Sequence, residues 1–352
     1  MSKLFETLDL GDLQIPNRIV MAPMTRSRAD DDGLVGPITA TYYAQRAGAG
    51  LILSEGIFPT AMGKGYVRTP GLVTRAQTEA WRRVTDAVHE AGGRIFAQLM
   101  HTGRISDPSF LPGGALPVAP SAIAANGSTY TDAGLKPLPT PRALETGEIP
   151  AVIDAYRQAT ERAFEAGFDG VEFHAASGYL PEQFLSSETN RRTDRYGGSI
   201  ENRLRFTLEA LEAIVSVRGG GRVGIKIAPE LGFNDLRDET PLETYGQLAE
   251  SIAPLGLAYL HVTPGARPET WHELLRQRFG GAYLAGGGFD QQRATALLAA
   301  GGADGIVFGN AFIANPDLPA RFRLGAPLAE ADRSTFYSPG PSGYIDYPAV
   351  AA

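Results

Sequence analysis

The chain of 352 residues contains no cysteine. This absence excludes disulfides, thiolate metal sites and a cysteine nucleophile, and it is compatible with a reducing compartment. No apolar run approaches the ~20 residues that a membrane-spanning helix needs, and residues 1–10 lack the apolar core of a signal peptide. No long run of Lys and Arg occurs, and the net charge is −7. We therefore expect a cytoplasmic protein with neither a membrane nor a nucleic acid as partner.

Short apolar runs recur along the chain, and 43% of its residues are apolar. Runs without polar alternation are typical of buried parallel strands. Residues between them have helical spacing: 78–91, 153–166, 202–217, 245–253 and 291–300. The strands that we predict are residues 19–21, 51–54, 94–99, 170–173, 223–227, 259–262, 282–285 and 305–308. This pattern predicts an α/β protein, a single (β/α)8 barrel over residues 1–352.

Two segments depart from this alternation of strands and helices. Residues 101–150 follow the third strand, are rich in Pro, Gly, Ser and Ala, and show little helical period. A connection of that length is normally functional or itself folded, so we predict a lid-like insertion over the barrel mouth. Residues 8–18 are typical of a small hairpin, which we expect to cap the bottom of the barrel.

The active site of such a barrel lies at the C-terminal ends of its strands. The fourth strand ends at His174, followed by Ser177 and, just past a glycine, by Tyr179. An imidazole, a hydroxyl and a phenol at one strand end can hold an oxyanion and deliver a proton. Glycines 286–288 and 309 follow the last two strands, where this architecture usually binds phosphate. The sequence therefore indicates a phosphate-bearing cofactor beside an acid–base site, and no metal site is predicted.

A set of motifs extends, in order, over nearly the whole chain: residues 16–26, 42–47, 96–104, 171–180, 192–203, 315–319 and 343–348. The stretch RTDRYGGSIENR at 192–203 is especially distinctive. With these motifs the chain resembles the Old Yellow Enzyme family of FMN-dependent ene-reductases. The resemblance implies an oxidoreductase that takes hydride from NADPH or NADH and passes it through FMN to a small-molecule activated alkene.

The resemblance also implies roles for individual residues. His174 and Ser177 would hold a carbonyl or nitro oxygen, flavin N5 would pass hydride to Cβ, and Tyr179 would protonate Cα. Met100 and Tyr337 would line the substrate pocket. The residues implied to bind FMN are Pro23, Met24, Thr25, Gly56, Gln98, Lys226, Gly287, Gly288, Gly309 and Asn310.

Four of these positions depart from the family pattern. Ser177 stands where the family usually has Asn or His, and Met100 where Trp is common. Lys226 and Asn310 stand where Arg is usual. A charge-assisted hydrogen bond contributes ~1.5–3 kcal/mol, which is about one to two decades of affinity. Weaker retention of FMN and a specialised substrate are therefore hypotheses for this chain.

Three functions remain compatible with the sequence. The first is an ene-reductase acting on an α,β-unsaturated carbonyl or nitroalkene, as a monomer or homodimer. The second keeps the flavin but performs an oxidation, desaturation or isomerisation in secondary metabolism. The third, a flavin-free cyclase or ligand-binding barrel, is supported only by Lys226 and Asn310. The other implied flavin and substrate residues favour the first two functions.

Overall fold

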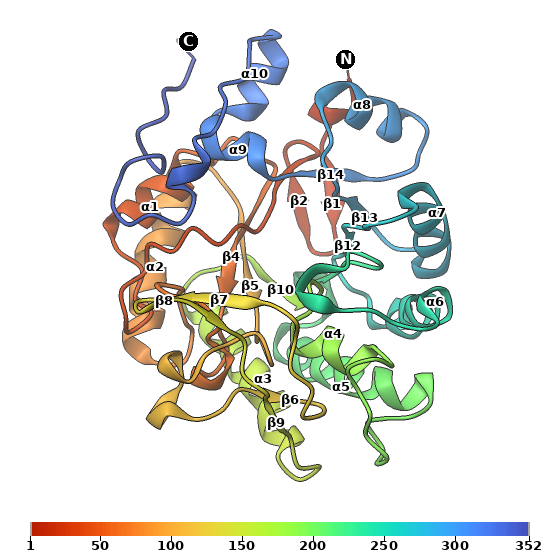
Figure 1. Ribbon diagram of the computed structural model, residues 1–352. Helices are drawn as coiled ribbons and strands as arrows, with labels where there is room; N and C mark the ends of the chain where they lie inside the picture. The colour runs from red at the N-terminus through yellow and green to blue at the C-terminus, as the bar shows by residue number, and fades with distance from the viewer. Residues whose placement is uncertain (1, 351–352) are drawn as a thin grey trace.

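The structure is a computed structural model that describes residues 2–350, and eight parallel strands in this range close into a barrel (Figure 1). Around the barrel the order is β10-β11-β12-β13-β14-β3-β4-β5. The strands are β3 (Ile19–Met21), β4 (Leu51–Ile57), β5 (Ile95–Leu99), β10 (Gly170–Ala175), β11 (Val223–Ile227), β12 (Tyr259–Val262), β13 (Tyr283–Ala285) and β14 (Gly305–Phe308). The predicted fold class is confirmed, and β4 and β10 extend further than predicted.

The interior of the barrel has an apolar floor that the N-terminal hairpin closes. Strands β1 (Leu8–Leu10) and β2 (Leu13–Ile15) pair antiparallel, and their leucine and isoleucine side chains pack in one cluster with Val20, Leu51 and Phe96. The rings of Phe96 and Tyr259 stack at 5.9 Å within this cluster. The Asp12 amide donates to Gly221 O at 3.0 Å, just ahead of β11. The hairpin therefore caps the N-terminal end of the strands, as predicted.

Helices surround the barrel and cover its outer face (Figure 1). They are α1 (Pro37–Ala44), α2 (Arg75–Glu90), α3 (Ile149–Glu165), α4 (Leu180–Leu185), α5 (Ile200–Arg218), α6 (Pro241–Ile252), α7 (Pro268–Phe279), α8 (Gln291–Ala299), α9 (Asn310–Ala314) and α10 (Leu318–Leu324). Helix α2 starts at a capping box of Thr74 and Gln77, in which each side chain binds the other's backbone amide. No helix within residues 2–350 is long and apolar enough to cross a membrane.

The insertion after β5 is folded rather than structureless. It contains two paired segments, β6 (Val118–Ala119) with β9 (Arg142–Ala143) and β7 (Ser128–Thr131) with β8 (Gly134–Pro137). In Figure 1 the β7–β8 hairpin passes in front of the barrel strands. Ala125 and Leu138 of the insertion pack in one cluster with Met100 and Tyr179. The insertion therefore packs against the residues that follow β10. Its action as a lid remains a prediction.

The C-terminal segment is held against the loop that follows β3. The Arg26 guanidinium donates to Phe336 O and Gly343 O, at 3.1 and 2.8 Å. The Arg28 guanidinium donates to four backbone carbonyl oxygens between residues 335 and 342, one of which is again Phe336 O. These buried arginines fix the segment that carries Tyr337 beside the barrel mouth.

Candidate functional site

Alternation along β10 directs two polar side chains into the barrel. Residues two apart on a strand share a face, so Glu172 and His174 both point inward, one layer apart. Glu172 pairs in register with Gln98 of β5. His174 pairs with Lys226 of β11, which pairs in turn with His261 of β12. Four neighbouring strands thus contribute polar groups to the upper interior of the barrel.

A tight turn after β10 brings Tyr179 back over His174. Ser177 and Gly178 have φ values of 61° and 74°, in the left-handed region. Asn234 Nδ2 donates to Ser177 O at 2.8 Å, and the Gly178 backbone amide donates to Glu182 Oε2 at 2.6 Å. The rings of His174 and Tyr179 then lie 5.2 Å apart between centroids. The three residues predicted to be catalytic therefore lie together at one strand end.

The phenol of Tyr179 has a second phenol as its partner. The Tyr66 and Tyr179 hydroxyl oxygens lie 2.9 Å apart, and their rings meet edge to face. Burial raises the pKa of both phenols, and the Asn234 side chain opposes the shift at each. Tyr179 is therefore protonated at neutral pH, as a proton donor requires. Tyr66 and Asn234 were not predicted as site residues, because each lies in a loop far along the chain from the motif at the end of β10.

His174 is a neutral imidazole in this environment. Burial lowers its pKa well below the ordinary value, and the positive charge of Lys226 and the nearby His261 add to the effect. Its Nδ1 atom is buried and has no hydrogen-bond partner within residues 2–350. A neutral imidazole has one N–H donor, so His174 can polarise an oxygen without carrying a charge.

The residues implied to contact flavin come from adjacent strand ends. The Ala22 amide donates to Phe308 O at 2.9 Å, which joins the ends of β3 and β14. A side chain at Gly309 would approach Met24 Sδ at 3.8 Å, and one at Gly56 would collide with Met100 Sδ at 2.5 Å. Met24 therefore lies beside Gly309, and Met100 packs directly on Gly56. Contact of these residues with flavin remains a prediction.

The loop after β13 forms an open cradle of backbone. Gly287 and Gly288 have φ values of 123° and 69°, and a Cβ atom added to either would have no neighbour within 4 Å. Side chains with Cβ rarely adopt such angles, so glycine keeps these amides accessible. Asn310 is exposed and is the first residue of α9. This helix follows β14, the strand that pairs with β13.

Two cationic or polar side chains of the mouth lack partners. No hydrogen bond or ion pair joins the Lys226 ammonium or the Thr25 hydroxyl to another side chain between residues 2 and 350. Burial lowers the pKa of Lys226, while Glu172 and Glu182 oppose this shift. An unpaired ammonium, a free hydroxyl and an open glycine cradle fit a flat cofactor that carries carbonyls and a phosphate.

Met100 and Tyr337 differ in their exposure. Met100 is buried in the cluster that contains Tyr179. Tyr337 is 61% exposed, and its backbone carbonyl accepts from Arg68 at 3.1 Å. The phenol of Tyr337 is close enough to raise the pKa of Tyr179. Pro23 is partly exposed at the end of β3. Both predicted substrate-pocket residues thus lie near the proton-donor candidate.

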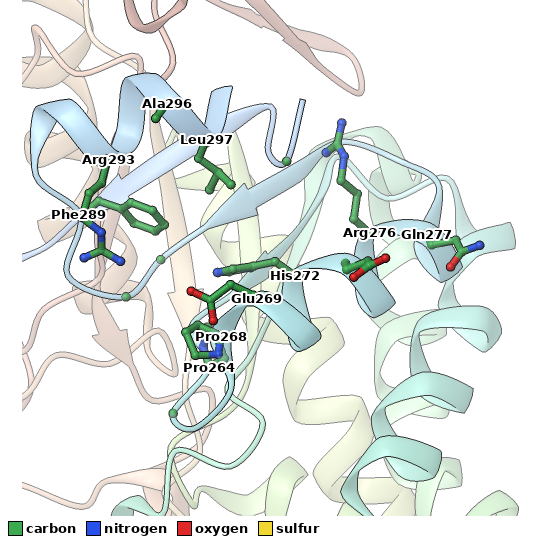
Figure 2. Close-up of a pocket in the computed structure, with 15 residues that line it drawn as sticks. Pro264, Pro268, Glu269, His272, Arg276, Gln277, Phe289, Arg293, Ala296 and Leu297 are labelled. Atoms are coloured by element: carbon green, nitrogen blue, oxygen red, sulfur yellow. The ribbon is translucent and has the colours of Figure 1, made fainter. Parts of the chain in front are cut away.

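A separate hollow of about 680 Å³ lies outside the barrel, between α7 and α8 (Figure 2). It shares Gly286 and Gly287 with the loop after β13, and its walls carry Glu269, Arg276 and Arg293. Charges of both signs favour no single class of ligand there. In the described part of the chain, no group of three or more His, Asp or Glu side chains could hold a metal ion.

Comparison with known proteins decides the family. The model of the NADH:flavin oxidoreductase / NADH oxidase family matches residues 3–329. The chain belongs to this NADH:flavin oxidoreductase family. It is 42% identical to 12-oxophytodienoate reductase 1 of Oryza sativa subsp. japonica, over 96% of this chain and 91% of that protein. It is 40% identical to a probable flavin mononucleotide-dependent alkene reductase of Leishmania infantum, over 98% of this chain and 97% of that protein.

A solved structure of morphinone reductase in complex with tetrahydroNAD superposes on this chain with a TM-score of 0.96. The two are 50% identical over 99% of this chain and 98% of that one. A neighbour titled as an old yellow enzyme homologue from Zymomonas mobilis has a TM-score of 0.95. The predicted Old Yellow Enzyme relationship is confirmed. This NADH:flavin oxidoreductase is therefore an FMN enzyme that takes its electrons from a reduced nicotinamide nucleotide.

Proposed function

We propose that the chain is an FMN-dependent ene-reductase that uses NADPH or NADH to reduce an α,β-unsaturated carbonyl compound or a nitroalkene. The observation that carries this proposal is the contact of an imidazole with a phenol at the end of β10, 5.2 Å apart between the ring centroids of His174 and Tyr179. Relatives named as reductases of 12-oxophytodienoate and of alkenes support the same class of substrate.

In this proposal His174 and Ser177 bind the oxygen of the substrate. The neutral imidazole donates one hydrogen bond, and the Ser177 hydroxyl donates a second. Two donors aimed at the oxygen stabilise the negative charge that develops there when the alkene accepts hydride at Cβ. The hydride would come from FMN held at the barrel mouth and reduced by NAD(P)H.

Tyr179 completes the reduction by protonating the substrate. Its Oη–H bond breaks, the proton goes to Cα, and the electron pair of the enolate forms the new C–H bond. The adjacent Tyr66 hydroxyl, 2.9 Å away, can then return a proton to Tyr179. Burial keeps the pKa of both phenols raised, so both start the cycle protonated.

The remaining residues of the mouth hold the cofactor in this proposal. Pro23 and Met24 would pack near the flavin ring, Thr25 would hydrogen-bond near its C4 carbonyl, and Gly56, Gln98 and Lys226 would meet its pyrimidine edge. Backbone amides of two loops, at residues 287–288 and 309–310, would bind the phosphate. Met100 and Tyr337 border the substrate, and the insertion at 101–150 covers it as a lid. The whole chain is then one FMN-binding domain, as monomer or homodimer.

The test is product analysis with a cyclic enone and a nitroalkene under anaerobic conditions, with and without NADPH. We expect the saturated product only when NADPH is present, and loss of product formation in Tyr179→Phe. Product formed without NADPH would favour an oxidation or isomerisation instead. A colourless protein that cannot be reconstituted with FMN would favour a flavin-free function.

A further inference from the structure

One buried acid inside the barrel has no part in the proposed chemistry. Glu172 is fully buried, one layer below His174 on the same face of β10. Toward the floor it neighbours Tyr259, whose pKa is raised by burial and by the Glu172 charge and whose ring stacks on Phe96. A carboxylate in such a place is costly unless it is paired and hydrogen-bonded. The hydrogen-bond partners of Glu172 therefore decide whether its carboxyl group can be ionised.

Both carboxylate oxygens of Glu172 have partners from neighbouring strands. Gln98 Nε2 donates to Glu172 Oε1 at 2.7 Å, and His261 Nδ1 lies 3.0 Å from Glu172 Oε2. A carboxylate only accepts, so Nδ1 carries the hydrogen. His261 Nε2 then accepts from the Thr263 hydroxyl at 3.2 Å. A continuous hydrogen-bonded row runs from Gln98 across three strands to the end of β12.

The carboxylate of Glu172 is ionised within this row. Burial alone would raise its pKa, but His261, the Lys226 ammonium and the Gln98 amide outweigh burial and hold the pKa below its usual value. Glu172 therefore places a fixed negative charge directly under the two side chains, Gln98 and Lys226, that meet the flavin in the proposed function.

The row also fixes the orientation of the Gln98 amide. Because one N–H of Nε2 is committed to Glu172, the carbonyl Oε1 and the second N–H remain for the mouth. A free glutamine could rotate its amide and exchange these atoms. With Glu172 as partner, one arrangement of acceptor and donor is presented to the pyrimidine edge.

We propose that Glu172, supported by His261, is a positioning residue that orients Gln98 toward FMN and sets the reduction potential of the bound cofactor through its negative charge. This inference rests on the proposed function, because it concerns the same site. A negative charge near the pyrimidine edge disfavours the reduced cofactor, which holds more electron density there. Removal of the charge should therefore favour reduced over oxidised FMN.

The test is Glu172→Gln, in which the amide keeps the shape and removes the charge. The midpoint potential of bound FMN is measured by anaerobic spectroelectrochemical titration, and the dissociation constants by titration of the apoprotein. We expect the preference for reduced over oxidised FMN to rise about tenfold, which raises the potential by about 30 mV for a two-electron couple. The control is Glu209→Gln, which makes the same change on α5 at a carboxylate bound to Tyr196; its potential should equal the wild-type value.

Glu172→Asp separates charge from position. It keeps the charge and withdraws the carboxylate from Gln98, so we expect a near-wild-type potential with FMN binding weakened at least threefold. A wild-type potential in folded, FMN-loaded Glu172→Gln overturns the charge effect. If that variant does not fold, wild-type FMN affinity in Glu172→Asp overturns the positioning effect. Wild-type protein that binds no FMN would instead overturn the proposed function itself.

Discussion

The hydroxyl oxygens of Tyr66 and Tyr179 lie 2.9 Å apart, and at the mouth of the barrel Tyr179 is buried and Tyr66 partly buried. If Tyr66 returns the proton that Tyr179 donates, Tyr66→Phe should slow alkene reduction about tenfold. Tyr179→Phe should slow it by about 10²–10⁴, the usual contribution of a general acid. Stopped-flow measurement of each half-reaction separates these steps, because neither variant should change the rate at which NADPH reduces the flavin.

The control for the Tyr66 variant is Tyr130→Phe, on the exposed β7–β8 hairpin. This variant also removes a tyrosine hydroxyl, but one that makes no hydrogen bond to Tyr179. Its rate of alkene reduction should equal the wild-type rate. Alkene reduction by Tyr66→Phe at the wild-type rate would show that solvent, not Tyr66, reprotonates Tyr179.

Ser177 has a backbone conformation that suits asparagine better than serine. Its φ of 61° is in the left-handed region, where Asn is enriched among residues other than glycine. The Asn side chain is also longer and ends in an N–H donor. We therefore expect Ser177→Asn to raise kcat/KM for a simple cyclic enone about tenfold, and Ser177→Ala to lower it several-fold. Steady-state assays measure these changes in kcat/KM. Unchanged activity in Ser177→Asn would show that Ser177 does not weaken binding of the substrate oxygen.

Asn310 leaves the proposed phosphate site without the arginine that is usual there. Restoring it with Asn310→Arg should add a charge-assisted hydrogen bond of about 1.5–3 kcal/mol and tighten FMN binding by roughly one to two decades. Fluorescence titration of the apoprotein gives the dissociation constant. Ala320→Arg adds the same charge at an exposed site on α10 and serves as control. Equal tightening in both variants would mean that net charge, and not a phosphate contact, is responsible.

Glu182 makes stability depend on pH in a predictable direction. Burial raises its pKa from 4.5 to about 7, despite hydrogen bonds from Tyr245 and the Gly178 amide. A native pKa above the unfolded value means that the native state holds the extra proton, so stability falls as pH rises from about 4.5 through 7. The difference between the unfolded and native pKa values of Glu182 corresponds to about 3 kcal/mol in the free energy of unfolding. Glu182→Gln mimics the protonated acid and should lose this dependence.

Urea unfolding of the FMN-loaded protein at pH 5 and pH 8 measures this effect. Other titrating groups, including the buried Glu55, are present in both proteins and cancel in the comparison. Glu182→Gln should gain roughly 2.5 kcal/mol relative to wild type between the two pH values, because part of the loss in wild type already occurs below pH 5. An equal pH dependence in both proteins would mean that Glu182 is ionised throughout.

The sequence predicted the barrel because buried parallel strands leave short, unbroken apolar runs, and β3, β11, β12 and β14 begin and end where those runs do. It also indicated His174, Ser177 and Tyr179, because one strand end and one turn contain all three. Five helices were missed: α1, α4, α7, α9 and α10. Helices α4, α9 and α10 have only five to seven residues, too few to show a helical period, whereas α1 and α7 have eight and twelve.

The remaining site residues could not be predicted because only closure of the barrel brings them together. Tyr66 follows β4, Asn234 follows β11 and His261 lies on β12, so each is far in the chain from the residue that it contacts. The left-handed conformation of Ser177 left no trace in the sequence either, because serine is not the residue that favours it.

The most direct test of the account is the visible absorption spectrum of the purified protein, followed anaerobically. We predict a bound flavin that bleaches when NADPH is added and regains its colour on addition of a cyclic enone, with one saturated product formed per flavin reoxidised. A protein that stays colourless after incubation with FMN, or a bleached flavin that the enone does not reoxidise, would contradict the account.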